Sequence, residues 1–220
     1  MHLTDDHRLV LGPEPDDTRA VVLMLHGGAE RGLHPIDERS VAYRRTQWMT
    51  TSISGRLARS GVRTALLRFQ LKGWNAGHGP EPSPVADARE ALAVLHAAVP
   101  DQPIVVVGHS MGGRTAAWVA DAPGVVGVVG LAPWLPADDP VHALRGKHLV
   151  AAHGRRDRIT SARATAAYVH RAEQVAASAR FVDMGALGHY MVAGVRRWNA
   201  TAVSATLSIV DTVAGVTSPD

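Results

Sequence analysis

The stretch Ile104-Val-Val-Val-Gly108-His109-Ser110-Met111-Gly112-Gly113 decides the fold. It opens with a run of apolar β-branched residues, which is typical of a strand covered on both faces in a parallel sheet. The pattern Gly-x-Ser-x-Gly follows at once and leads into a segment with helical spacing. In such a strand–turn–helix unit the serine is lifted on a sharp turn at the carboxyl end of the strand, where open α/β sheets bind their ligands. The alternative is a glycine-rich turn whose serine has no chemical role.

Apolar runs alternate along the whole chain with segments of helical spacing. The predicted strands are residues 20–25, 62–69, 103–107, 125–131, 147–152 and 179–184, and the predicted helices are residues 86–99, 113–122, 161–178 and 192–213. This alternation predicts an α/β fold, namely a doubly wound, mostly parallel sheet with helices on both faces. We expect one domain over residues 1–220, with its core at about 20–213.

Two connections between the predicted elements bear on a functional site. Residues 29 to about 51 precede the next helix and are numerous enough to form a binding loop over the site. Between Leu131 and Lys147 only about fifteen residues intervene, too few for a separate lid domain. We therefore expect a shallow site, covered by loops at most.

Composition and charge limit the class of protein. Hydrophobic residues make up 46% of the 220 residues and charged residues 20%, so neither a disordered chain nor a fibre fits. The formal net charge is +3, and charges of both signs are interspersed. The densest basic run, residues 155–158, contains an aspartate, so we do not expect a nucleic-acid partner.

The chain has no cysteine, which excludes disulfides, a thiolate nucleophile and a cysteine-ligated zinc site. The 12 histidines show neither the H-E-x-x-H pattern nor paired histidine–carboxylate spacing, so we expect no metal and no other cofactor. The first 17 residues lack the basic and apolar regions of a signal peptide, and the apolar runs are too short to cross a bilayer. We expect a cytoplasmic protein without a membrane partner.

Candidates for a base and an acid follow Ser110 along the chain. A serine hydroxyl needs a base to take its proton, and the base needs a group that orients it. Asp157 follows the fifth predicted strand, and His189 lies in a loop after the sixth. A carboxylate at 157 can accept a hydrogen bond from an imidazole and stabilise its charged form. Taken singly, Asp157 can instead pair with a neighbouring arginine, and His189 can be an ordinary surface residue.

Backbone donors for a developing oxyanion are predicted after the first strand and at the start of the helix that follows Ser110. In His26-Gly27-Gly28-Ala29, glycine lets N–H groups face a reacting carbonyl. We predict the N–H groups of Gly28 and Met111, with Gly27 as the alternative to Gly28. His26 is expected to brace the loop through hydrogen bonds. A plain turn is the other interpretation of this segment.

Taken together, four short segments resemble the α/β-hydrolase superfamily, in particular its small lidless esterases and thioesterase-like members. The segments are HGG at 26–28, GHSMGG at 108–113, HGRRD at 153–157 and GH at 188–189, and the resemblance spans about 21–213. It implies that Ser110 is the nucleophile, His189 the general base and acid, and Asp157 the orienting carboxylate. Gly28 and Met111 match the oxyanion positions of the family.

The resemblance also leaves one alternative for the acid and removes two branches of the superfamily. Some members carry the acid after the fourth strand, where this chain has Asp138 and Asp139, although Asp157 is preferred. Because Ser110 occupies the turn, the aspartate-nucleophile epoxide hydrolases and haloalkane dehalogenases are excluded. The cysteine-nucleophile dienelactone hydrolases are excluded for the same reason.

Four large side chains are predicted near the mouth of a substrate pocket: Trp48, Met49, Trp74 and Trp134. Their alternative role is ordinary packing in the core or on the surface. An apolar pocket with few polar groups favours an acyl chain or an aromatic ester.

The sequence thus predicts a serine hydrolase that cleaves a carboxylic ester or thioester of a small molecule through an acyl-enzyme. One alternative is a non-catalytic scaffold of the same fold that binds a small ligand or a partner. Another keeps the three residues but serves an acyltransferase, a C–C bond hydrolase or a perhydrolase, because fold alone does not choose the chemistry.

Overall fold

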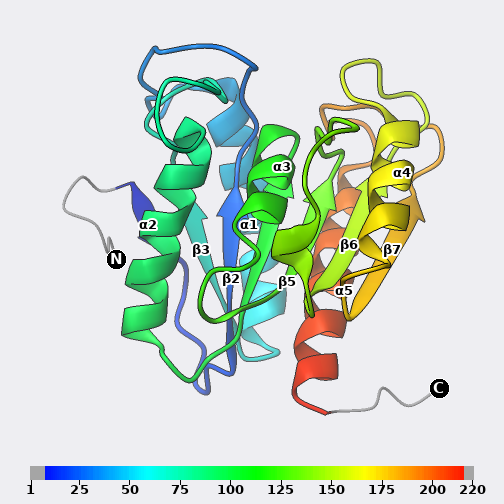
Figure 1. Ribbon diagram of the computed structural model, residues 1–220. Helices are drawn as coiled ribbons and strands as arrows, with labels where there is room; N and C mark the ends of the chain where they lie inside the picture. The colour runs from blue at the N-terminus through cyan, green and yellow to red at the C-terminus, as the bar shows by residue number, and fades with distance from the viewer. Residues whose placement is uncertain (1–7, 216–220) are drawn as a thin grey trace.

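The computed structural model describes residues 8–215 and is built around a seven-stranded sheet (Figure 1). The strands are β1 (Leu9–Leu11), β2 (Ala20–Leu25), β3 (Val62–Leu67), β4 (Ile104–His109), β5 (Val125–Leu131), β6 (His148–His153) and β7 (Ser178–Asp183). Their order is β1-β3-β2-β4-β5-β6-β7; β1 pairs antiparallel with β3, and the other neighbours pair in parallel.

Alternate residues of the central strands enter separate cores on the two faces of the sheet. In β2, Val21 and Leu23 belong to one core, whereas Val22 and Met24 belong to the other. Helices α2 (Ser83–Ala98), α3 (Met111–Trp118) and α4 (Ala162–Ala172) cover the first face, and α1 (Val41–Ala58) and α5 (Val195–Val213) cover the second (Figure 1). The predicted doubly wound, mostly parallel sheet with helices on both faces is confirmed.

Helix α1 corrects one expectation, because a loop is predicted for residues 29 to about 51 and the helix already begins at Val41. Its buried face includes Thr46 and Thr50, so apolar residues alone do not show the helical spacing. Threonine also has a low intrinsic helix propensity. In the structure the hydroxyl of Thr50 donates to the carbonyl of Thr46, 2.8 Å away, which allows this polar group to be buried inside the helical packing.

Smaller differences concern the ends of elements. The helix predicted over 161–178 ends at Ala172, because Ser178 already pairs with His148 as the first residue of β7. Strand β1 is only 3 residues long, too short to be recognised from a pattern, although Leu9 is fully buried.

The connection from β5 to β6 contains only a short 3-10 helix, η1 (His142–Leu144), among its described elements. This agrees with the expectation that no separate lid domain is inserted there. The carboxyl ends of the parallel strands lie at the upper edge of Figure 1, where their loops gather. Within residues 8–215, no helix combines the length and the apolar character needed to span a bilayer.

Candidate active site

Ser110 occupies the turn between β4 and α3 in a conformation that non-glycine residues rarely adopt, with φ 55° and ψ −118°. Its N–H donates to the carbonyl of Leu131 at 3.1 Å. Its own carbonyl accepts from the N–H groups of Gly113, Arg114 and Trp134, at 3.0, 3.2 and 3.0 Å. A strained backbone of this kind costs about 1–3 kcal/mol. These hydrogen bonds hold the turn in place and offset that cost.

The glycines around Ser110 allow strand and helix to approach each other closely. A Cβ atom on Gly108 would overlap the carbonyl oxygen of Gly112. A Cβ atom on Gly112 would lie 2.6 Å from the carbonyl oxygen of His26, at the end of the neighbouring strand. Backbone atoms cannot move aside as a flexible side chain can, so glycine is required at both positions.

The structure brings Ser110, His189 and Asp157 together at the carboxyl edge of the sheet. Ser110 Oγ is 3.0 Å from His189 Nε2, and His189 Nδ1 is 2.7 Å from Asp157 Oδ2. Asp157 lies in the loop after β6, and His189 lies in the loop between β7 and α5. The side chains of His189 and Asp157 are 6% and 0% exposed. The order of the three residues along the chain suggested that His189 would contact both Ser110 and Asp157, and both contacts are present. The catalytic role of the three residues stays a prediction.

The Asp157 carboxylate is held by several donors. Oδ1 accepts the backbone N–H groups of Ile159 and Thr160, at 2.8 and 2.9 Å, and Oδ2 accepts the Thr160 hydroxyl at 3.0 Å. Burial raises the pKa of Asp157, but hydrogen bonds from His153, His189 and these backbone groups together hold it well below its usual value. An ionised carboxylate only accepts, so His189 Nδ1 carries the proton and Nε2 presents a lone pair to Ser110.

His153 is a residue of the site that sequence reasoning did not assign. Its ring is fully buried, with Nε2 3.1 Å from Asp157 Oδ2 and Nδ1 2.8 Å from the Thr165 hydroxyl. Two imidazoles therefore share one carboxylate oxygen. The only signal in the sequence is the position of His153 four residues before Asp157, in the segment HGRRD.

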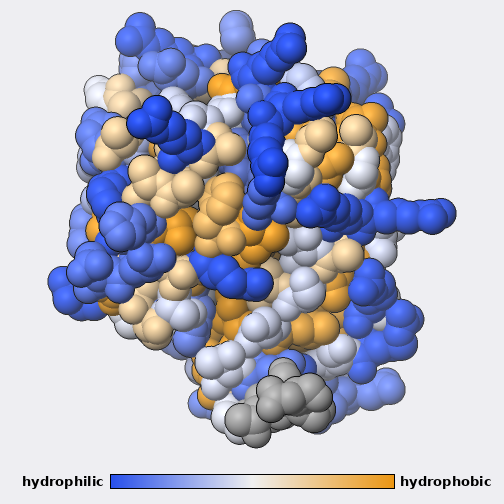
Figure 2. Space-filling model, turned by 90° about the vertical axis from the view of Figure 1, so that its right-hand side faces the viewer, coloured by the Kyte–Doolittle hydropathy of each residue, from blue (hydrophilic) through white to orange (hydrophobic). Residues whose placement is uncertain are grey.

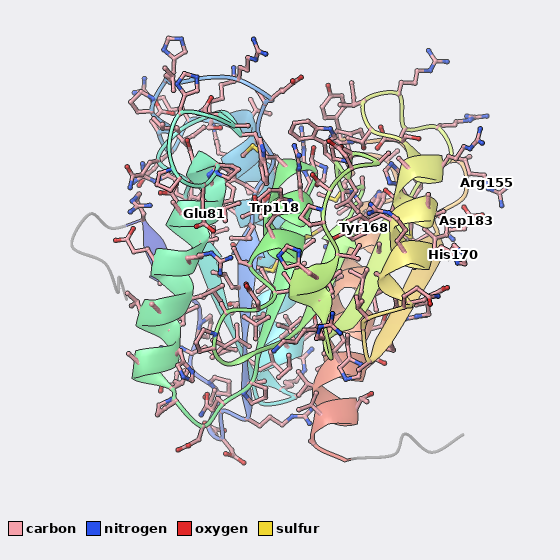
Figure 3. The ribbon with its side chains drawn as sticks, viewed as in Figure 1. Glu81, Trp118, Arg155, Tyr168, His170 and Asp183 are labelled. Atoms are coloured by element: carbon pink, nitrogen blue, oxygen red, sulfur yellow. The ribbon has the colours of Figure 1, made fainter. Side chains whose placement is uncertain are left out.

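Of the other candidate acids, Asp138 lines the cavity that contains Trp74, and Asp139 has a different partner. Both carboxylate oxygens of Asp139 bind the guanidinium of Arg114, at 2.7 and 2.6 Å. Pairing of Asp157 with Arg155, Arg156 or Arg158 was the alternative, but the ion pairs of Asp157 are with His153 and His189. Arg155 instead binds Asp183 at the β7 edge, where Figure 3 labels both side chains. Of Asp157 and Asp139, it is Asp157 that contacts His189.

The backbone N–H groups of Gly28 and Met111, the two predicted oxyanion donors, have no acceptor in the part of the chain that the structure describes, and the same holds for the alternative donor Gly27. Met111 is the first residue of α3, where backbone N–H groups have no partner within the helix. Gly27 lies against the turn, since a Cβ atom built on it would be 3.3 Å from Ser110 Cβ. Gly28 follows Gly27 directly and lies against the Met111 side chain, while the role of Gly28 and Met111 as oxyanion donors stays a prediction.

His26 fixes the orientation of the Gly28 N–H. Its Nε2 accepts the N–H of Phe69 at 3.0 Å, so the ring proton lies on Nδ1 and is donated to the carbonyl of Gly27 at 2.6 Å. The carbonyl and N–H of one trans peptide point in opposite directions. Holding the Gly27 carbonyl toward His26 therefore turns the Gly28 N–H away from it. Burial lowers the pKa of His26 to about 4, so the ring is neutral at pH 7.

His109 was likewise not assigned a role from the sequence. Its Nε2–H donates to the backbone carbonyl of His189 at 2.9 Å, and the two rings lie 4.9 Å apart. Burial, followed by the nearby His189, lowers the pKa of His109 to about 3. This neutral ring ties the loop that carries His189 to the turn that carries Ser110.

The four predicted pocket residues line two separate cavities. Trp48 and Met49 lie on α1 and line a cavity of about 490 Å³ that extends to the start of α5. Trp74 and Trp134 line another cavity, of about 440 Å³, on the opposite face near α3. Their rings lie against the Arg114 guanidinium, 4.0 and 4.4 Å from it. The four residues do not form one pocket mouth, and their contact with a substrate stays a prediction.

Comparison with protein families decides the identity of the fold. The model of the alpha/beta hydrolase family matches residues 22–215, which is most of the chain. The chain belongs to the alpha/beta hydrolase family. This agrees with the resemblance inferred from its short motifs. No curated protein matches the sequence of this alpha/beta hydrolase.

Solved structures of low sequence identity share the fold. A lidless serine hydrolase from Xanthomonas campestris is 16% identical, with 91% of this chain and 88% of that chain covered and a TM-score of 0.65. A serine hydrolase homologue from Coxiella burnetii is 17% identical, with 89% of each chain covered and a TM-score of 0.66. The propionate-bound esterase Est2 from Thermogutta terrifontis is 15% identical, with 96% and 91% covered and a TM-score of 0.67. At these identities the similarity establishes the fold.

Proposed function

We propose that this chain is a serine hydrolase that cleaves a carboxylic ester or thioester of a small molecule through an acyl-enzyme formed on Ser110. The observation that carries the proposal is the pair of contacts made by His189, at 3.0 Å to Ser110 Oγ and 2.7 Å to Asp157 Oδ2. Membership of the alpha/beta hydrolase family supports hydrolysis. The esterases among the similar structures support an ester as the bond cleaved.

In the first step His189 Nε2 takes the proton of Ser110 Oγ while that oxygen attacks the carbonyl carbon of the substrate. Asp157 stabilises the imidazolium that forms and keeps the ring in the required tautomer. The depressed pKa of Asp157 keeps its carboxylate ionised for this purpose. The carbonyl oxygen of the substrate becomes negatively charged as the tetrahedral intermediate forms.

That oxyanion is stabilised by the free N–H groups of Gly28 and Met111. Both are fixed before the substrate arrives, Gly28 through the hydrogen bond from His26 to Gly27 and Met111 through its position at the start of α3. Such preorganised donors cost no reorganisation during the reaction, and removal of one typically raises the barrier by about 3 kcal/mol.

Collapse of the intermediate expels the alcohol or thiol, which takes the proton from His189 Nε2. The acyl group then remains on Ser110 Oγ. In the second step His189 takes a proton from water, the resulting hydroxide attacks the acyl carbon, and the proton returns to Ser110 as the carboxylic acid leaves. The same donors and the same carboxylate serve both steps.

Turnover of p-nitrophenyl acetate together with labelling by a fluorophosphonate tests the proposal. We expect the wild-type protein to hydrolyse the ester and to be labelled at Ser110, and Ser110→Ala to lose both properties. Ser204→Ala is the matched control, because Ser204 is an exposed serine of α5 that donates to its own helix. A folded wild-type protein with neither turnover nor label would instead support the non-catalytic scaffold.

The remaining expectations stay predictions. They are a small-molecule substrate, the absence of a nucleic-acid or membrane partner, a cytoplasmic location and the absence of a metal or other cofactor. Within residues 8–215, no group of three or more His, Cys, Asp or Glu side chains is placed to hold a metal ion.

A further inference from the structure

Two cavities lie next to each other beside the candidate active site. The inner cavity, of about 410 Å³, is lined by Gly28, and the outer cavity, of about 490 Å³, is the one lined by Trp48. Val41, Arg45 and Tyr190 line both. Tyr190 also follows His189 directly, with the two rings 5.5 Å apart. The inner cavity therefore reaches Gly28, and the outer cavity adjoins it along Val41, Arg45 and Tyr190.

The outer cavity is lined by apolar side chains that are unusually exposed. Trp48 is 63% exposed and Val192 is 72% exposed. Eight large hydrophobic residues are exposed in the described part of the chain, and five of them line this cavity: Val41, Trp48, Tyr190, Val192 and Val195. Figure 2 shows apolar surface between long hydrophilic side chains in its upper right part, on the side where α1 and α5 lie. An apolar concentration of this kind marks a binding surface.

Cations surround this apolar surface. Arg39, Arg44, Arg45 and Lys72 line the two cavities, against one carboxylate, Asp37. Positive and negative charges are far more evenly balanced in the whole chain, which has 23 Lys and Arg and 20 Asp and Glu. The two cavities are therefore a locally positive site.

Arg45 is the most informative of these cations. It is half-buried and belongs to both cavities, and no carboxylate of residues 8–215 is paired with it. Its guanidinium lies over the ring of Tyr190, 5.0 Å from the ring centroid. A partly buried guanidinium without an anion interacts more strongly with an incoming oxyanion than a fully solvated one does. Its planar donors suit a carboxylate or a phosphate.

We propose that the substrate carries both an apolar group and a negatively charged oxyanion group, a carboxylate or a phosphate. This proposal rests on the proposed function, because it places the scissile carbonyl at Gly28. The apolar group occupies the outer cavity against Trp48, and the anion is bound by Arg45 at the junction of the two cavities. The substrate class is thus an anionic, amphiphilic ester or thioester.

The apolar part of the proposal is tested with p-nitrophenyl esters of increasing acyl length, from acetate to octanoate. We expect kcat/KM to rise by about fourfold for each methylene that becomes buried. The rise should be much smaller in Trp48→Ala. A kcat/KM that is independent of acyl length in the wild-type protein would overturn this part.

The charged part of the proposal is tested by comparing how tightly three competitors of equal chain length bind to the protein. They are octanol, octanoate and octyl phosphate. We expect at least one of the anions to bind tenfold more tightly than octanol, and the tighter of the two identifies the oxyanion. This advantage should disappear in Arg45→Gln and persist in Arg56→Gln, the control on an exposed position of the same helix. Equal binding of octanol and both anions would overturn the proposal.

Binding measured by tryptophan fluorescence in Ser110→Ala separates the two proposals. If the wild-type protein shows no turnover but Ser110→Ala retains the preference for an anion, the proposed function fails and the binding site stands. If turnover and labelling of Ser110 are found but neither acyl length nor charge matters, the proposed function stands and this inference fails.

Discussion

Replacing His26 by asparagine or by glutamine separates its two hydrogen bonds. The asparagine amide can occupy the position of Nδ1 and still donate to the Gly27 carbonyl, whereas the glutamine amide can occupy the position of Nε2 and still accept from Phe69. His26 is fully buried, with Nδ1 2.6 Å from the Gly27 oxygen and Nε2 3.0 Å from the Phe69 nitrogen. Each variant therefore leaves one buried backbone group without a partner.

The expected magnitudes differ for stability and for activity. An unsatisfied buried donor or acceptor costs about 1–3 kcal/mol, so both variants should lose a similar amount of stability. Only glutamine releases the Gly27 carbonyl and thus the orientation of the Gly28 N–H. Complete loss of one oxyanion donor lowers kcat by about 10²–10³, which is the upper bound for His26→Gln. His26→Asn should stay within about tenfold of the wild-type kcat.

The assay is kcat and KM for p-nitrophenyl acetate, measured beside the urea-induced unfolding of each variant. A fall in kcat for glutamine without a comparable fall for asparagine supports the positioning role. Equal kcat values in two variants of equal stability would refute the reasoning, because the Gly28 N–H would then not depend on His26.

Three further predictions concern the site and its scaffold. Asp157→Asn should lower kcat by about 10⁴ because His189 then loses its required tautomer, and a loss below tenfold with p-nitrophenyl acetate would contradict this. His26 and His109, with folded pKa values of about 4 and about 3 against 6.5 unfolded, bind protons more readily when unfolded. The free energy of unfolding should therefore fall by about 1.4 kcal/mol per pH unit for each histidine as pH drops from 6 to 4, and a slope in urea titrations that does not decrease in His109→Gln would refute the assignment. Gly55→Ala in α1 should raise the free energy of unfolding by about 1 kcal/mol, because the added Cβ meets only Arg59 Nη1 at 4.0 Å; destabilisation in urea would contradict it.

Part of the site could be predicted because local chemistry specifies it. The run before Ser110 forms a buried strand, and only a turn with glycines on both sides lets that strand pass into α3. Chain order then suggested Asp157 and His189, since loops after parallel strands meet at one edge of the sheet.

Contacts that depend on the conformation of the loops in the folded protein were not predicted. His153 and His109 belong to segments whose motifs are recognisable, yet their hydrogen bonds to Asp157 and to the His189 carbonyl arise only in the folded loops. For His26, hydrogen bonds that brace the loop were expected and are present, but the sequence did not show that the distant Phe69 sets its tautomer.

The cavities could not be predicted because α1 was not recognised. Its buried Thr46 and Thr50 hide the helical spacing, so the segment that contains Val41 and Arg45 resembles a loop. Without the helix, Trp48 and Met49 could not be distinguished from Trp74 and Trp134, which lie on the opposite face of the sheet.

Acid quenching during turnover of p-nitrophenyl acetate, followed by mass spectrometry of the peptides, tests the covalent intermediate most directly. The account predicts a single acetyl group on the peptide that contains Ser110, at that side chain, with none in Ser110→Ala. Undiminished turnover by Ser110→Ala, or an acetyl group on a different side chain in the wild-type protein, would contradict it.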